Sequence, residues 1–104
     1  MTILAGLCSI TFRDLAVDDV VALAAEAGLA GIEWGADRHV PPGSDAGSVA
    51  DRCADAGLAC PSYGTYLSAG RAAVDDVDAA CATAVELGAT NLRIWAPDEA
   101  GAAD

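Results

Sequence analysis

Residues 25–34 read AEAGLAGIEW, and this pattern of a small-residue helix end, a glycine and an apolar run returns twice. Residues 54–63 read ADAGLACPSY and residues 85–95 read VELGATNLRIW, so Gly28, Gly57 and Gly88 follow one another at intervals of 29 and 31 residues. Glycine adopts the left-handed conformation that ends many helices at little steric cost. A helix-ending glycine before an apolar strand, repeated at this interval, indicates consecutive βα units and a parallel sheet.

The hydrophobic periodicity around these glycines predicts an α/β fold with the element order βαβαβαβ. The strands are expected at residues 3–9, 31–34, 58–63 and 91–95, and the helices at residues 17–27, 45–56 and 72–87. Right-handed crossovers would place the strands in sequence order in one parallel sheet. The last helix is expected to turn an apolar stripe inward, formed by Val74, Val77, Cys81, Ala84 and Val85.

Four strands and three helices correspond to the first half of a (β/α)8 TIM barrel, a fold that typically needs about 250 residues. We expect a partial barrel over residues 1–97, and an acidic tail over residues 98–104 that begins a missing second half. Both edges of such a sheet would be open, which favours pairing with another half or self-association. A self-contained small open α/β domain is the alternative.

The net charge limits the possible binding partners, and the cysteines indicate the cellular compartment. Sixteen acidic residues against five basic ones give a net charge of −11, which argues against nucleic-acid and anionic-membrane partners. The four cysteines form no C-x-x-C pair, and one histidine leaves no zinc pattern. Buried reduced cysteines, together with an N-terminus unlike a signal peptide, favour a cytoplasmic protein.

The loop after residues 31–34 carries the histidine, at the end of a strand where parallel α/β enzymes keep their chemistry. His39 follows this strand end by five residues, and Asp37 stands two positions before it. A carboxylate near an imidazole can orient it for proton transfer, so His39 is the candidate catalytic residue. A histidine in a solvated loop is the alternative.

Every aromatic residue lies near a predicted C-terminal strand end: Phe12, Trp34, Tyr63, Tyr66 and Trp95. Because alternate strand residues face opposite ways, Trp34 should pack outward against the helices. Trp95 should point inward with Arg93, and Glu33 and Arg93 should form a buried ion pair on the inner face. We take Phe12, Tyr63 and Trp95 as candidate substrate-binding residues, with plain core packing as the alternative. No cluster of carboxylates and histidines at the strand ends of this sequence could hold a divalent metal.

Several short segments, in their order and spacing, resemble the N-terminal half of the xylose isomerase-like TIM barrels, the sugar phosphate isomerases and epimerases. They are GLCSITFR at 6–13, GIEWG at 31–35, HVPPG at 39–43, PSYGTY at 61–66, and LGA at 87–89 with LRIWA at 92–96. The resemblance implies a (β/α)8 barrel that isomerises or epimerises a sugar or sugar phosphate. It also implies Mn²⁺ or Mg²⁺, held in full-length relatives by Glu, Asp and His residues of strands five to eight.

On this resemblance the chain would supply the substrate side of the site and lack the metal ligands, so alone it is expected to be inactive. His39 looks like the loop histidine that handles sugar hydroxyl protons, and Trp95 looks like the strand-four tryptophan that lines the sugar site. The related DNA-repair endonucleases carry metal-binding histidines where this sequence has Tyr63 and Trp95, which argues against a nuclease. A non-enzymatic half-barrel that acts as a binding or assembly module is the alternative.

Overall fold

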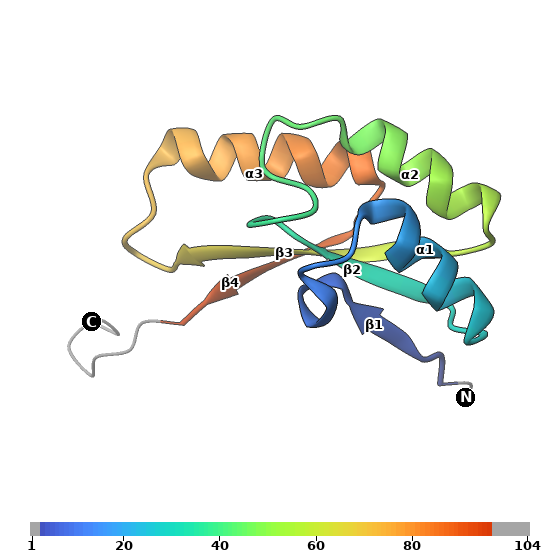
Figure 1. Ribbon diagram of the computed structural model, residues 1–104. Helices are drawn as coiled ribbons and strands as arrows, with labels where there is room; N and C mark the ends of the chain where they lie inside the picture. The colour runs from blue at the N-terminus through green and yellow to red at the C-terminus, as the bar shows by residue number, and fades with distance from the viewer. Residues whose placement is uncertain (1–2, 97–104) are drawn as a thin grey trace.

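The computed structural model describes residues 3–96, which form a parallel sheet with three helices on one face (Figure 1). The strands lie in the order β1-β2-β3-β4 and alternate with the helices, as predicted. The elements are β1 (Gly6–Cys8), a 3₁₀ helix η1 (Ser9–Phe12), α1 (Val17–Glu26), β2 (Gly31–Gly35), α2 (Ala46–Asp55), β3 (Ala59–Ser68), α3 (Val74–Leu87) and β4 (Asn91–Trp95).

The three repeated glycines end the three helices in the predicted way. Gly28, Gly57 and Gly88 have φ angles of 74°, 76° and 76° and stand directly after the last turns of α1, α2 and α3. A side chain is strained in this left-handed conformation, so glycine lets the chain turn from each helix toward the next strand.

The core lies between the sheet and the helices. Ile32 and Trp34 of β2 and Tyr63 of β3 are fully buried on this face, with Val20 of α1 and Cys53 of α2. The Tyr63 hydroxyl donates a hydrogen bond to the carbonyl oxygen of Val40 at 2.6 Å, which satisfies the polar end of the ring. The prediction that Trp34 packs toward the helices is confirmed.

Two strand lengths differ from the prediction. Strand β1 has only three residues, whereas β3 has ten and runs on through Tyr66. The register between β3 and β4 shifts after Gly64, and the next pair is Ser68 with Trp95. This irregularity lets β3 continue beyond the apolar run that marks its beginning in the sequence.

The inward face of α3 also differs from the prediction. The residues that α3 buries are Ala80, Thr83, Ala84 and Leu87, whereas Val74, Val77, Cys81 and Val85 are exposed. Of the predicted stripe only Ala84 is buried, together with the small residues Ala80 and Thr83 and with Leu87, and the larger apolar residues lie on a neighbouring side of the helix. The periodicity identified an apolar side of α3 but not the side that meets the sheet.

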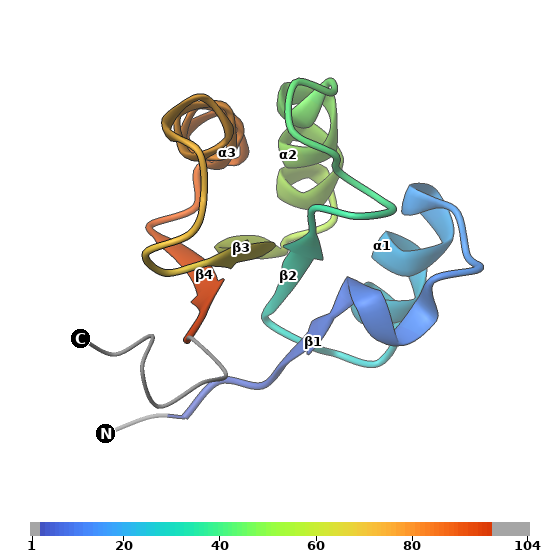
Figure 2. The same cartoon turned by 90° about the vertical axis from the view of Figure 1, so that its left-hand side faces the viewer.

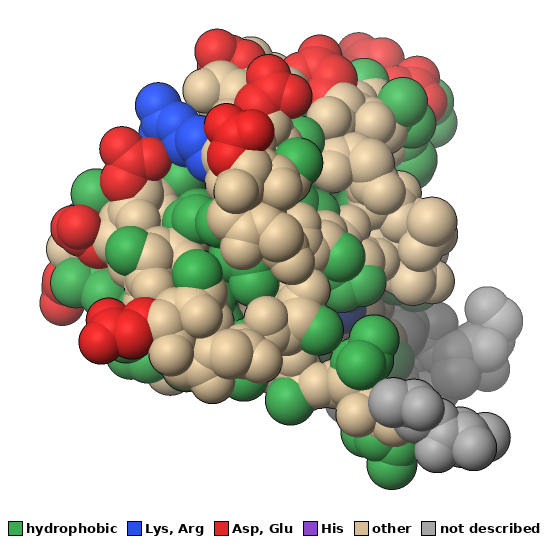
Figure 3. Space-filling model, turned by 90° about the vertical axis from the view of Figure 1, so that its right-hand side faces the viewer, with side chains coloured by type: hydrophobic (Ala, Val, Ile, Leu, Met, Phe, Trp, Pro, Cys, Tyr) green, Lys and Arg blue, Asp and Glu red, His purple; other side chains and the backbone are tan. Residues whose placement is uncertain are grey.

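Charge is concentrated on the helix layer. Viewed from the side where the strands begin, acidic side chains spread over the helices with few basic neighbours (Figure 3). Among residues 3–96, no helix combines the length and the apolar character that crossing a membrane requires.

Candidate functional site

The opposite face of the sheet, here called the helix-free face, carries no helix within residues 3–96 (Figure 2). The register places Cys8 of β1 beside Glu33 of β2, and Gly64 of β3 beside Arg93 of β4. Because Trp34 and Tyr63 face the helices, their strand neighbours Glu33 and Gly64 face the other way. Four neighbouring strands therefore contribute to one surface.

Glu33 and Arg93 form the predicted ion pair across this surface. Arg93 Nη1 lies 3.3 Å from Glu33 Oε1, and Arg93 Nη2 donates a hydrogen bond to the carbonyl oxygen of Thr65 at 2.9 Å. The pair reaches over β3 at Gly64, where a Cβ atom would lie 2.5 Å from Glu33 Oε1. The side chains of Glu33 and Arg93 remain 22% and 33% exposed, so the pair is confirmed but its burial is only partial.

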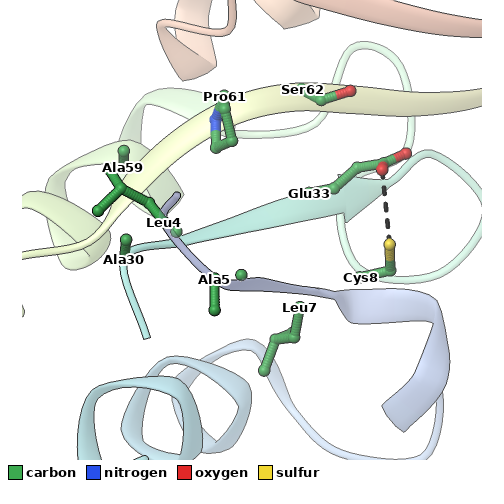
Figure 4. Close-up of a pocket in the computed structure, with 11 residues that line it drawn as sticks. Leu4, Ala5, Leu7, Cys8, Ala30, Glu33, Ala59, Pro61 and Ser62 are labelled. Carbon is green, nitrogen blue, oxygen red and sulfur yellow. Dashed lines mark hydrogen bonds between the residues drawn. The ribbon is translucent and has the colours of Figure 1, made fainter. Parts of the chain in front are cut away.

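Cys8 lies beside Glu33 on the same face of the sheet. Its thiol donates a hydrogen bond to Glu33 Oε2 at 3.5 Å, as Figure 4 shows. Although Cys8 is exposed, partial desolvation of its thiol raises the pKa, the negative charge of Glu33 raises it further, and Arg93 opposes the shift. The thiol therefore stays protonated at neutral pH. It lies at one end of a shallow hollow of about 390 Å³ whose lining, mostly apolar, includes Leu4, Pro61 and Ser62.

The C-terminal ends of the strands hold a group of side chains that we call the aromatic–guanidinium cluster: Arg13, Tyr66, Arg93 and Trp95. The rings of Tyr66 and Trp95 stack with centroids 6.3 Å apart and an interplanar angle of 28°. Arg93 Cζ lies 5.4 Å from the Tyr66 centroid and 5.1 Å from the Trp95 centroid, within cation–π range. Arg13 donates a hydrogen bond to the Tyr66 hydroxyl at 3.3 Å and pairs with Asp37.

This cluster could bind a small polar molecule with apolar faces. Tyr66 and Trp95 are 46% and 48% exposed, so a ligand can reach both rings. Guanidinium and carboxylate groups at the border of the rings offer hydrogen-bond donors and acceptors. Rings with polar groups beside them are suited to sugars, which combine C–H faces with hydroxyl groups.

His39 lies elsewhere, on the side of the sheet that the helices cover. A nitrogen of its ring, Nε2, donates a hydrogen bond to the carbonyl oxygen of Leu15 at 2.8 Å. The ring packs edge-on against Trp34, with centroids 5.8 Å apart and an angle of 71°. Asp37, expected to orient His39, instead pairs with Arg13. His39 therefore joins the loop before α1 to the loop after β2, and the structure does not bring it together with Trp95.

The three residues predicted to bind substrate do not lie together in the structure either. Tyr63 is fully buried in the core and does not lie beside the exposed rings of Tyr66 and Trp95. Phe12 is partly buried against the same core at the end of η1. Trp95 alone of the three belongs to the aromatic–guanidinium cluster. The sequence analysis placed Tyr66 near a strand end but did not select it as a candidate, although its even position puts it on the same face as Gly64 once β3 extends that far.

The four cysteines are unpaired, but only Cys53 and Cys60 are buried as expected, whereas Cys8 and Cys81 are exposed. A hydrogen bond from Cys60 lowers the pKa of Cys53 to about 7. Within residues 3–96, no group of three or more His, Cys, Asp or Glu side chains gathers closely enough to hold a metal ion.

Comparison of the sequence with models of known protein families and with curated proteins finds no match. The fold and the site define the class: a parallel α/β protein whose sheet leaves one face free of helices. This face carries the ion pair of Glu33 and Arg93 and, at the C-terminal strand ends, the aromatic–guanidinium cluster.

Proposed function

We propose that this chain is built as the first half of a (β/α)8 barrel and supplies the sugar-binding wall of an isomerase or epimerase. The relevant class is that of the xylose isomerase-like barrels, which the sequence resembles. Strands in sequence order with all helices on one face support the half-barrel architecture. The observation that carries the functional proposal is the half-exposed stack of Tyr66 and Trp95 at the C-terminal ends of β3 and β4.

In this proposal the cluster binds and orients a sugar or sugar phosphate. The ring faces of Tyr66 and Trp95 pack against the C–H groups of the sugar, and Arg13 and Asp37 hydrogen-bond its hydroxyl groups. Glu33 holds Arg93 beside the rings, so the platform is formed before the ligand arrives. The hydrogen bond from His39 to Leu15 joins the loop before α1 to the loop after β2, which carry Arg13 and Asp37 near the cluster.

A divalent metal is expected for full-length relatives, whereas no group of three or more possible ligands gathers within residues 3–96, and the proposal includes no step on a metal. The four unpaired thiols support the proposal of a cytoplasmic protein.

Tryptophan fluorescence tests this proposal because the two tryptophans differ in exposure. Trp34 is fully buried, whereas Trp95 is half-exposed, so an emission change on adding ketoses or ketose phosphates reports on Trp95. Binding, followed independently by NMR chemical shifts, should be lost in Trp95→Ala. It should persist in Ile94→Ala, whose side chain is 49% exposed on the same strand. Binding to neither sugar class, or equal losses in both variants, would refute the proposal.

A second candidate function is a non-enzymatic half-barrel that serves as an assembly module. The outer edges of β1 and β4 favour it, because neither edge is paired among the described residues.

A further inference from the structure

Cys53 and Cys60 form a pair of thiols in the core, between the sheet and helix α2. Cys53 lies in the last turn of α2 and is fully buried, and Cys60, the second residue of β3, is 9% exposed. The side chains share a hydrogen bond, so the two sulfur atoms are neighbours. Two neighbouring thiols can form a disulfide, which a single buried cysteine cannot do within one chain.

The turn between α2 and β3 holds the two cysteines close to each other. Only six residues separate them in the sequence. Within this segment the backbone N–H of Leu58 donates a hydrogen bond to the carbonyl oxygen of Cys53 at 2.8 Å, so the chain reverses direction directly after the helix. A short turn fixed by backbone hydrogen bonds, rather than a long loop, therefore sets the distance between Cys53 and Cys60.

An extra residue in β3 turns Cys60 toward α2. Between two successive pairings with β3, β2 advances by two residues, whereas β3 advances by three, from Ala59 to Ser62. In a regular strand Cys60 and Tyr63 would face opposite sides of the sheet, because they are three residues apart. Both are instead buried in the core. Irregularities of this kind re-aim a side chain, and they occur often beside functional sites.

The surroundings favour a thiolate on Cys53 and a proton on Cys60. The hydrogen bond from Cys60 lowers the pKa of Cys53 to about 7, although burial opposes this shift. The same hydrogen bond raises the pKa of Cys60, and burial raises it further. Trp34 Nε1 is buried without a well-aligned hydrogen-bond partner among residues 3–96, yet it is near enough to both sulfurs to lower their pKa values. A thiolate on Cys53 would give this N–H an acceptor.

We propose that Cys53 and Cys60 form a dithiol that hydrogen peroxide oxidises to a disulfide. The Cys53 thiolate attacks one oxygen of the peroxide, the O–O bond breaks, and the hydroxide that leaves becomes water by taking the proton that Cys53 lost on ionising. Cys53 is then a sulfenic acid. The Cys60 sulfur displaces its hydroxyl group, which leaves as a second water with the Cys60 proton. The two thiols are oxidised, and one peroxide is reduced to two waters.

Tryptic digestion offers a direct test, because the arginines separate the four cysteines into three peptides. Residues 53–71 hold both members of the pair, whereas Cys8 and Cys81 lie in residues 1–13 and 72–93. The folded 104-residue chain is treated with hydrogen peroxide, the excess is removed with catalase, and the remaining thiols are alkylated in urea before digestion. We expect the peptide 53–71 to lose two hydrogen atoms and to take up no alkyl group before Cys8 and Cys81 are oxidised. Dithiothreitol should restore both alkylations.

Variants and pH assign the two roles. Cys60→Ala should stop the reaction at a sulfenic acid on Cys53, which dimedone traps, whereas the matched control Cys81→Ala should form the disulfide at the wild-type rate. From about pH 6 to about pH 8 the rate should rise only about tenfold, because Cys53 has a pKa of about 7. A thiol with the ordinary pKa of about 8.5 would gain about 75-fold, and that result would overturn Cys53 as the attacking group.

Two further results would overturn the proposal as a whole. One is a disulfide between Cys53 and Cys60 that forms only when the chain is unfolded in urea. The other is a peptide 53–71 that is still fully alkylated once Cys8 and Cys81 have been oxidised, because the pair would then be ordinary core cysteines.

Discussion

Replacing Glu33 with glutamine tests whether the helix-free face is held by its ion pair. Two unit charges 3.3 Å apart attract by about 5 kcal/mol at an effective dielectric constant of about 20. Desolvation and residual solvent offset much of this energy, because the two side chains are only partly buried. Losing one partner of a pair costs about 3–5 kcal/mol when the pair is buried and about 0–1 kcal/mol when it is exposed. We therefore expect Glu33→Gln to lower the free energy of unfolding by about 2 kcal/mol.

Urea denaturation measures this change directly, and thermal unfolding should show a midpoint lower by about 8–16 °C. Asp18→Asn is the matched control, since it also removes one negative charge and breaks an ion pair, but the side chains of Asp18 and Arg52 are 72% and 48% exposed. Its cost should stay below about 1 kcal/mol. Equal losses in the two variants would show that the partial burial of Glu33 and Arg93 adds nothing to their attraction.

Three further predictions follow from particular contacts on the two faces of the sheet. Gly64→Ala should lower the free energy of unfolding, measured in urea, by about 2 kcal/mol or more, because the new Cβ would meet Glu33 Oε1 at 2.5 Å. Gly47→Ala, whose new Cβ would have its nearest neighbour at 3.9 Å, should instead raise it by about 0.5–1 kcal/mol. Burial raises the pKa of Tyr63 to about 12, so the folded state holds its proton where the unfolded state releases it. The free energy of unfolding should therefore fall as pH rises from about 10 to about 12, and this part of the slope should vanish in Tyr63→Phe. Glu33→Gln should lower the pKa of Cys8 and accelerate its alkylation severalfold at neutral pH, as peptide mass spectrometry can follow; an unchanged rate would contradict the coupling between the two groups.

The fold could be predicted because its strongest signals are local. The backbone takes the left-handed conformation after each helix, and because this conformation favours glycine, the sequence has Gly28, Gly57 and Gly88 there. Alternation along β2 likewise placed Trp34 toward the helices and Glu33 on the opposite face. These properties depend on neighbouring residues alone.

The candidate site was only partly predictable, because it depends on contacts between distant segments. The position of His39 after a strand predicted its height along the sheet but not its side, and the hydrogen bond to Leu15 decides the side. Asp37 was expected to orient His39, but its carboxylate forms an ion pair with Arg13, which is 24 residues away in the sequence. Tyr66 was not selected as a site residue, because the register shift that extends β3 arises from pairing with β4.

The apolar stripe of α3 shows why hydrophobic periodicity alone did not identify the buried side of this helix. The sequence pattern marked the stripe as a packing surface, and in the structure of one chain most of it has nothing to pack against. The sheet is already covered by the small side of α3, so rotating the helix to bury Val74 and Val85 would expose Ala80 and Leu87 in their place. The spacing of Ala80, Ala84 and Leu87 identifies the side of α3 that meets the sheet, and apolar periodicity alone did not separate that side from the exposed one.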